Sequence, residues 1–176
     1  MRKALTTILA VVLFAAALPG LTGCFWKKVP KKWYNKTLDY YREGLSSNWA
    51  NEDPSNGFYI GSDLKVLDAS REFGYLITDL DGDGNDELLI GFNDGSGTTK
   101  FTDVYVWQRG YGAYQSFTGN DGYYTYLCGS GIIAHDSWYG SQTQREFLKW
   151  NPETGFFNVI EGEGKYLPMK WELTAF

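Results

Sequence analysis

A short acidic stretch between two apolar runs constrains this chain more than any other part of its sequence. Aspartates occupy every second position from Asp79 to Asp83, glycines at 82 and 84 interleave with them, and Glu87 closes the stretch. Apolar residues 75–77 precede it and residues 88–90 follow it. Such runs on either side of a Gly/Asp turn predict two strands joined by a loop. The crowded carboxylates repel one another unless a cation lies among them, and hard oxygen ligands at this spacing suit Ca²⁺.

The spacing of the acidic residues distinguishes this loop from an EF-hand loop. Counted from Asp79, acidic side chains stand at positions 1, 3, 5 and 9, and Gly84 stands at position 6, where the chain turns sharply. Position 12 is Ile90, where an EF-hand needs a bidentate glutamate. We therefore expect Glu87 to close the site. The alternative is an acidic hairpin whose Asp and Gly residues serve turn geometry alone, but that does not explain the converging carboxylates.

The loop resembles the calcium loops of FG-GAP and VCBS-type repeats, whose pattern is Asp, an apolar residue, Asp-Gly-Asp-Gly, a later acid and Leu. Residues 79–88 match it, apolar Leu80 included. The resemblance implies that Ca²⁺ is bound by the carboxylates of Asp79, Asp81, Asp83 and Glu87 and by the backbone carbonyl of Asn85. These repeats more often have Asp at the ninth position, so the longer Glu87 either coordinates through both oxygens or displaces a water.

The N-terminus predicts export and a lipid anchor. Arg2 and Lys3 precede an almost wholly apolar run at 4–18, which is short for a membrane span. Residues 21–24 (LTGC) resemble a bacterial lipobox. The resemblance implies that residues 1–23 are a signal peptide and that Cys24 carries acyl chains such as palmitate on the extracytoplasmic face of the cell membrane. The alternative is an uncleaved signal anchor with an incidental cysteine.

The remaining chain divides into a basic tether, 24–36, and a single domain, 37–176. The tether contains five lysines that would lie beside anionic headgroups; the alternative is a solvated spacer. The whole chain has a formal net charge of −5 and becomes more acidic once the signal peptide is removed. An acidic domain with no basic stripe is a poor nucleic-acid binder, so we expect no nucleic-acid partner.

The sequence of residues 37–176 predicts an α+β fold in which one N-terminal helix packs on an antiparallel β-meander. Near-helical spacing of apolar residues predicts a helix from Lys32 to about Trp49. From Gly74 onward, short apolar runs alternate with turn residues. The expected strands are 74–78, 87–92, 101–108, 113–117, 123–128, 131–137, 144–150, 156–160 and 166–173. Pro168 predicts that the last strand lies at an edge or carries a bulge.

Two segments, 106–114 and 149–157, repeat one pattern: Trp, then Gly five residues later, then an aromatic residue two further on. Each predicts a hairpin of the kind found in propeller blades. The acidic loop occurs only once, which argues against a closed propeller.

Aromatic residues make up 18% of the chain, enough to fill a sheet core or to form an exposed binding platform. Core packing is one interpretation. In the other, Trp138, Tyr139 and Tyr123, which lie among turn-forming residues, bind a glycan or a peptide.

Catalytic signals are weaker. His135, Asp136 and Ser137 contain the letters of a triad, but adjacent strand residues point to opposite faces, so we expect a structural or surface histidine. Cys128 would be the only thiol left, and we expect a small hydrophobic residue there. One histidine and one free cysteine do not make the usual His/Cys zinc site.

Over residues 37–160 the order of helix, acidic loop and meander resembles a group of uncharacterised bacterial surface lipoproteins. We expect a non-catalytic lipoprotein with structural Ca²⁺, attached to the membrane by its lipid, with a cell-wall or extracellular glycan or protein as a further partner. One alternative is a glycan- or peptide-binding module that uses the aromatic loops, and the other is an envelope hydrolase.

Overall fold

The computed structural model describes residues 31–50, 52–53, 55, 59–66, 68–108, 112–118, 123–129, 131–139, 142–151, 154, 156–162 and 164–176. The predicted signal peptide 1–23, Cys24 and most of the tether 24–36 lie outside these residues, so they stay predictions. Among the described residues, no helix has the length and apolar character needed to cross a membrane.

One α-helix opens the domain. A 3₁₀ turn, η1 (Lys31–Tyr34), leads into α2 (Asn35–Ser46), and a second 3₁₀ turn, η3 (Ser62–Lys65), follows. The predicted helix is confirmed, but it ends before Trp49, which lies in a turn with a φ of 57°. This turn brings the Trp49 ring back into the core, where its indole N–H donates to the carbonyl of Leu64 at 2.9 Å.

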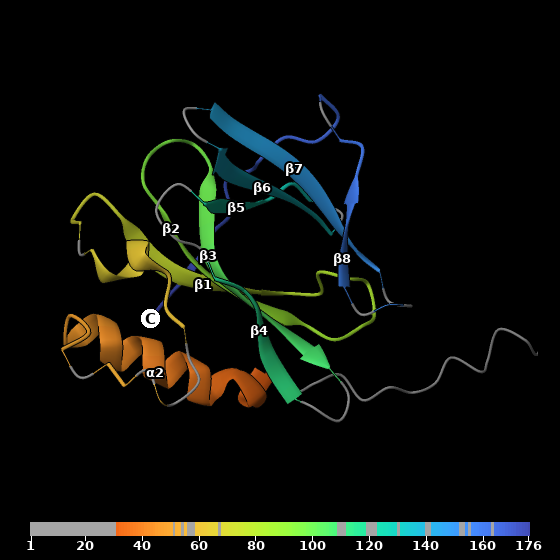
Figure 1. Cartoon of the computed structure of the whole chain (residues 1–176). Helices are drawn as coiled ribbons and strands as arrows, with labels where there is room; N and C mark the ends of the chain where they lie inside the picture. The colour runs from red at the N-terminus through yellow and green to blue at the C-terminus, as the bar shows by residue number, and fades with distance from the viewer. Residues whose placement is uncertain are drawn as a thin grey trace, which may run out of the picture.

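The rest of the domain is an antiparallel sheet of nine strands that does not close into a barrel. The strands run in the order β8-β7-β6-β5-β3-β2-β1-β9, and β4 pairs with another part of β3 (Figure 1). Their bounds are β1 (Glu72–Thr78), β2 (Glu87–Asn93), β3 (Thr99–Gln108), β4 (Gly112–Thr118), β5 (Tyr124–Leu127), β6 (Ile132–Tyr139), β7 (Gln142–Asn151), β8 (Phe156–Ile160) and β9 (Thr174–Ala175). The first eight predicted strands and the two repeated hairpins, β3–β4 and β7–β8, are confirmed.

The predicted last strand, 166–173, is wrong. This segment has no strand structure, and only β9, two residues long, pairs with β1. Isolated backbone bonds, such as the one from the Thr99 N–H to the Met169 carbonyl at 3.1 Å, and side-chain bonds hold it instead. The backbone N–H of Trp171 donates to the Thr99 hydroxyl at 2.7 Å, and the Asn93 amide donates to the Trp171 carbonyl at 3.3 Å. Pro168, which has no N–H, stands inside the segment and cannot donate to a ladder.

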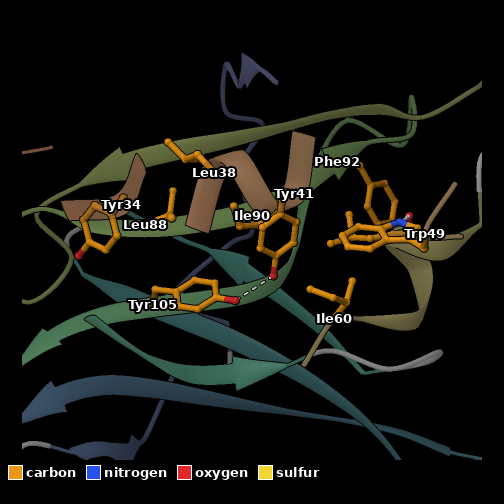
Figure 2. Close-up of a cluster of buried hydrophobic side chains, with 10 residues drawn as sticks. Tyr34, Leu38, Tyr41, Trp49, Ile60, Leu88, Ile90, Phe92 and Tyr105 are labelled. Atoms are coloured by element: carbon orange, nitrogen blue, oxygen red, sulfur yellow. Dashed lines mark hydrogen bonds between the residues drawn. The ribbon is translucent and has the colours of Figure 1, made fainter. Parts of the chain in front are cut away.

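α2 covers one face of β1, β2 and β3 (Figure 1). Alternate β2 residues, Leu88, Ile90 and Phe92, point toward the helix and meet Leu38 and Tyr41 there (Figure 2). All five are buried, and each large apolar side chain removed from water stabilises the fold by about 1.5–3 kcal/mol. This cluster attaches the helix to the sheet.

A second cluster fills the opposite face of the same strands. Leu89 of β2 and Val104 of β3 meet Leu127, Ile133 and Leu148, which come from β5, β6 and β7. Because strands far apart in the sheet order share this cluster, the sheet curls around it. The loop between β1 and β2 lies at the margin of this curled face, since Leu80 inserts into the same cluster.

Candidate metal centre

The acidic stretch forms the loop that connects β1 to β2. Thr78, the last residue of β1, pairs with Glu87, the first residue of β2, so residues 79–86 project beyond the end of the hairpin. Leu80 is only 3% exposed and anchors the loop in the core. The apolar residue between the first two aspartates therefore fixes the loop against the sheet and leaves Asp79 and Asp81 on its outer side.

The carboxylate of Asp79 holds the loop in its turned shape. Its Oδ1 accepts the backbone N–H of Gly82 at 2.8 Å, and its Oδ2 accepts that of Gly84 at 3.0 Å. The two glycines have φ values of 80° and 88°, a region that side chains disfavour. Each carboxylate oxygen has a second lone pair, so both remain able to bind a cation.

Three of the predicted ligands converge. One ligand oxygen from each of Asp79, Asp81 and Glu87 lies within 4.8 Å of the other two. Asp79 is exposed, Asp81 is partly buried and Glu87 is 1% exposed, so the triad runs from the surface into the protein. The structure thus confirms an acidic cluster able to hold a metal ion.

Glu87 is the most deeply buried of the three. Its Oε2 accepts the backbone N–H of Leu80 at 2.8 Å, whereas its Oε1 accepts no hydrogen bond from the described residues. Burial, followed by the charges of the loop aspartates, raises the pKa of Glu87 to about 8. Burial and the neighbouring aspartates also raise the pKa of Asp81 to about 6. A cation would reverse this penalty by supplying the missing positive charge.

Of the two other predicted ligands, Asp83 lies outside the triad, and the backbone carbonyl of Asn85 stays a prediction. The Asp83 carboxylate accepts the backbone N–H of Asn85 at 2.7 Å and its side-chain amide at 2.9 Å. Asp83 is exposed and is not one of the three converging carboxylates. The sequence pattern placed it at an alternating position, but the local turn directs its carboxylate to Asn85.

The loop is also attached to the start of the helix. The Tyr34 hydroxyl donates to the backbone carbonyl of Asp86 at 2.8 Å. Burial and then the charge of Glu87 raise the pKa of Tyr34, so this hydroxyl remains a donor. The conformation of the acidic loop therefore depends on the docked helix.

The donor set fits Ca²⁺. It consists of hard carboxylate oxygens on a glycine-turned loop, and one oxygen of the buried Glu87 accepts no hydrogen bond from the described residues. The triad offers no nitrogen or sulfur ligand, which softer metals prefer. Asp79, Asp81 and Glu87 would hold the ion.

The predicted aromatic platform is only partly described. Tyr123 is 40% exposed, and its ring stacks on that of His135 with centroids 6.5 Å apart. The side chains of Trp138 and Tyr139 lie outside the described part of the structure. Their backbones are not in a loop, because β6 extends through both and pairs with β7.

The triad-like letters do not form a catalytic relay in this sheet. Asp136 accepts two hydrogen bonds from Arg145, at 2.5 and 2.7 Å, across β6 and β7. His135 lies 3.2 Å from the Thr125 hydroxyl through its Nδ1, and burial lowers its pKa. Cys128 is partly buried against an apolar cluster, and burial raises the pKa of its thiol.

Two features escaped sequence reasoning. One is Asp103, a fully buried carboxylate in the middle of β3. A single acid among the apolar and aromatic residues of the predicted strand 101–108 is a signal that could have found it. The other is a cleft lined by Trp150 and Trp171 beside the acidic loop. No spacing rule brings these two tryptophans together, since they belong to β7 and to the irregular C-terminal segment.

Comparisons with known proteins add no relative: no protein-family model matches the chain, and no curated protein or solved structure matches it. The functional argument therefore rests on the residues of this chain.

Proposed function

We propose that this protein is a non-catalytic lipoprotein on the extracytoplasmic face of the cell membrane, with a structural Ca²⁺ in its Asp79–Glu87 loop. The buried Glu87 supports the metal most strongly. It lies within 4.8 Å of Asp79 and Asp81, and one of its oxygens accepts no hydrogen bond from the described residues. A buried carboxylate beside others of its charge is costly unless an ion compensates.

The location of the loop favours a structural ion over a sensor. The loop closes the β1–β2 hairpin, inserts Leu80 into the core and is bound by Tyr34 of the helix entry. An ion here would join three parts of the domain. Extracellular sites function with weak affinity because Ca²⁺ is abundant outside cells.

Thermal unfolding tests the metal assignment. Millimolar Ca²⁺ should raise the Tm of the wild type relative to EDTA, because a ligand of the folded state stabilises it. Asp81→Asn should lose most of this shift. Asp86→Asn removes the same charge from the same loop, outside the triad, and should keep the shift. An equal Ca²⁺ response in the wild type and Asp81→Asn would contradict the assignment.

The membrane assignment rests on the lipobox-like LTGC at 21–24. Two or more acyl chains anchor a protein far more firmly than one. Mass spectrometry of detergent-extracted protein should find a mature chain that begins with acylated Cys24. Cys24→Ser should abolish both acylation and membrane fractionation, whereas Cys128→Ser, the matched control, should retain both. An unmodified N-terminus at Met1 would refute the anchor.

A second candidate is a glycan- or peptide-binding role for the surface that includes Tyr123, Trp138 and Tyr139. The stacked, exposed Tyr123 ring favours it. On a glycan or peptide array, Tyr123→Ala should weaken capture relative to exposed Tyr59→Ala. Equal capture by the two variants would rule out this surface.

A further inference from the structure

A cleft of about 390 Å³ opens beside the acidic loop. Asp79 and Asp81 line it, and Trp150 of β7 and Trp171 of the C-terminal segment form another part of its lining. Small-molecule pockets measure about 300–1,000 Å³. The cleft thus has the size of a ligand site and shares two carboxylates with the metal triad.

Two glycines of the β5–β6 turn form another part of the cleft wall. Gly129 and Gly131 line the cleft with φ values of 83° and 69°. A Cβ atom on Gly131 would lie 2.3 Å from the backbone oxygen of Leu80. The turn therefore packs backbone to backbone against the acidic loop, and the space in front of Asp79 and Asp81 is left open.

The two tryptophan rings are held in place by other contacts. Trp150 packs edge to face on Phe157, with ring centroids 5.0 Å apart. The indole N–H of Trp171 donates to the carbonyl of Leu127 at 3.0 Å. Both side chains are only partly buried. Rings that are fixed before a ligand arrives lose little conformational entropy on binding.

Given the proposed Ca²⁺ site, on which this inference rests, we propose that the cleft binds a neutral sugar. Adjacent hydroxyl groups of the sugar would face the ion held by Asp79 and Asp81, and its apolar ring face would stack on Trp150. Ca²⁺ takes six to eight oxygen ligands, more than a carboxylate triad supplies unless all three bind bidentately. Neutral hydroxyl oxygens add ligands without adding negative charge.

The charges around the cleft favour a neutral ligand over an anion. Asp79 and Asp81 line it, and Asp83 and Glu87 are close enough to raise the pKa of neighbouring groups. Four carboxylates exceed the charge of one divalent ion. Among the described residues that line the cleft, Lys149 carries the one cationic side chain, and its ammonium can donate hydrogen bonds to sugar hydroxyls.

An oligosaccharide array with neutral and acidic members tests the proposal, using the full-length protein in detergent. Neutral glycans should be bound in millimolar Ca²⁺, and binding should weaken at least tenfold in EDTA, about 1.4 kcal/mol. Trp150→Ala should weaken binding roughly tenfold. Trp150→Phe keeps a ring against Phe157 and should lose less. The control Trp33→Ala removes an exposed tryptophan, 52% accessible, outside the cleft lining and should bind as the wild type does.

The Tm in Ca²⁺ and in EDTA is measured on the same samples. If Ca²⁺ raises the Tm but no neutral glycan binds, the sugar site is refuted and the structural Ca²⁺ stands. Binding confined to acidic glycans, or unchanged in folded Trp150→Ala, refutes it equally. If Ca²⁺ leaves the Tm unchanged and neutral glycans bind equally in EDTA, both the metal site and the cation-dependent sugar site are wrong.

Discussion

Two carboxylates lie deep in the same sheet, Glu87 at the start of β2 and Asp103 in the middle of β3. Neither is more than 1% exposed. Burial is the largest cause of a raised pKa in both, to about 8 for Glu87 and about 7 for Asp103. Their surroundings are opposite, and this difference separates a structural acid from a candidate metal ligand.

Asp103 is surrounded by donors. Its Oδ2 accepts the backbone N–H of Gly61 at 3.3 Å and the Thr102 hydroxyl at 3.2 Å, and its Oδ1 accepts the Gln115 amide at 2.9 Å. The Tyr41 hydroxyl also lowers its pKa through a hydrogen bond. Protein groups thus satisfy this carboxylate, and the network ties residue 61, β3, β4 and α2 together.

Among the described residues, Glu87 accepts one hydrogen bond, from the backbone N–H of Leu80, and the carboxylates of Asp79 and Asp81 lie close by. Equal burial therefore has two different consequences. Asp103 accepts several hydrogen bonds from the protein and takes up a proton near pH 7, whereas Glu87, with a single donor, needs a cation or a proton. Variants at the two sites should accordingly differ in their response to Ca²⁺.

The largest effect is expected for Asp103→Ala. It leaves several buried donors without an acceptor, at about 1–3 kcal/mol each. The free energy of unfolding, measured in urea, should fall by about 3 kcal/mol or more, by the same amount in Ca²⁺ and in EDTA. If Ca²⁺ restored the stability that Asp103→Ala loses, Asp103 would depend on the ion as Glu87 does, and the two carboxylates would not differ.

Glu87→Gln should show the reverse pattern. Its amide oxygen can still accept the N–H of Leu80, and it resembles the protonated glutamate, so stability in EDTA should change by less than about 1 kcal/mol. At a Ca²⁺ concentration 100 times the Kd, the variant should lack about 2.7 kcal/mol of stabilisation that the wild type gains. Asp86→Asn is the control, and an equal loss in EDTA and Ca²⁺ would contradict the role of Glu87.

The pH dependence of the free energy of unfolding tests the buried Asp103 carboxylate separately from the acidic loop. Its pKa in the folded protein, about 7, exceeds its ordinary value of 3.8, so the folded state holds the proton more tightly. The stabilising contribution is complete below about pH 3.8 and is lost as the pH rises through about 7. The slope is at most about 1.4 kcal/mol per pH unit.

The measurement is the wild-type free energy of unfolding minus that of Asp103→Asn, recorded across this range in EDTA. Other titrating groups contribute equally to both proteins and cancel in this difference. The difference should therefore decline as the pH rises and Asp103 of the wild type loses its proton. A flat difference would show that Asp103 titrates alike in both states.

The smallest effect is expected for Tyr41→Phe. The Tyr41 and Tyr105 hydroxyls lie 3.0 Å apart in the core (Figure 2). Removing the Tyr41 hydroxyl should lower the free energy of unfolding by about 1 kcal/mol and raise the pKa of Asp103, by removing a donor to its carboxylate. Tyr59→Phe, at an exposed ring, is the control. An unchanged free energy of unfolding for Tyr41→Phe would show that this hydroxyl does not stabilise the network.

Much of the fold follows from local pattern. Alternation of apolar residues, turn residues and the repeated Trp-Gly-aromatic spacing predict eight strands and two hairpins that the structure confirms. The prediction for 166–173 is wrong because apolar content alone cannot reveal whether a strand edge is available. There, Thr99 and Asn93 bind Trp171 through their side chains in place of a ladder.

In the acidic loop, too, some features follow from the local sequence and others depend on the tertiary structure. Its sequence determines the chelating residue types and the positive φ at Gly82 and Gly84, because these depend on neighbours within a few positions. Only the tertiary structure decided that Glu87 is buried, that Asp83 binds Asn85 outside the triad, and that Trp150 and Trp171 meet beside the loop. Those outcomes depend on how the sheet curls and where the C-terminal segment packs, through contacts between residues far apart in the chain.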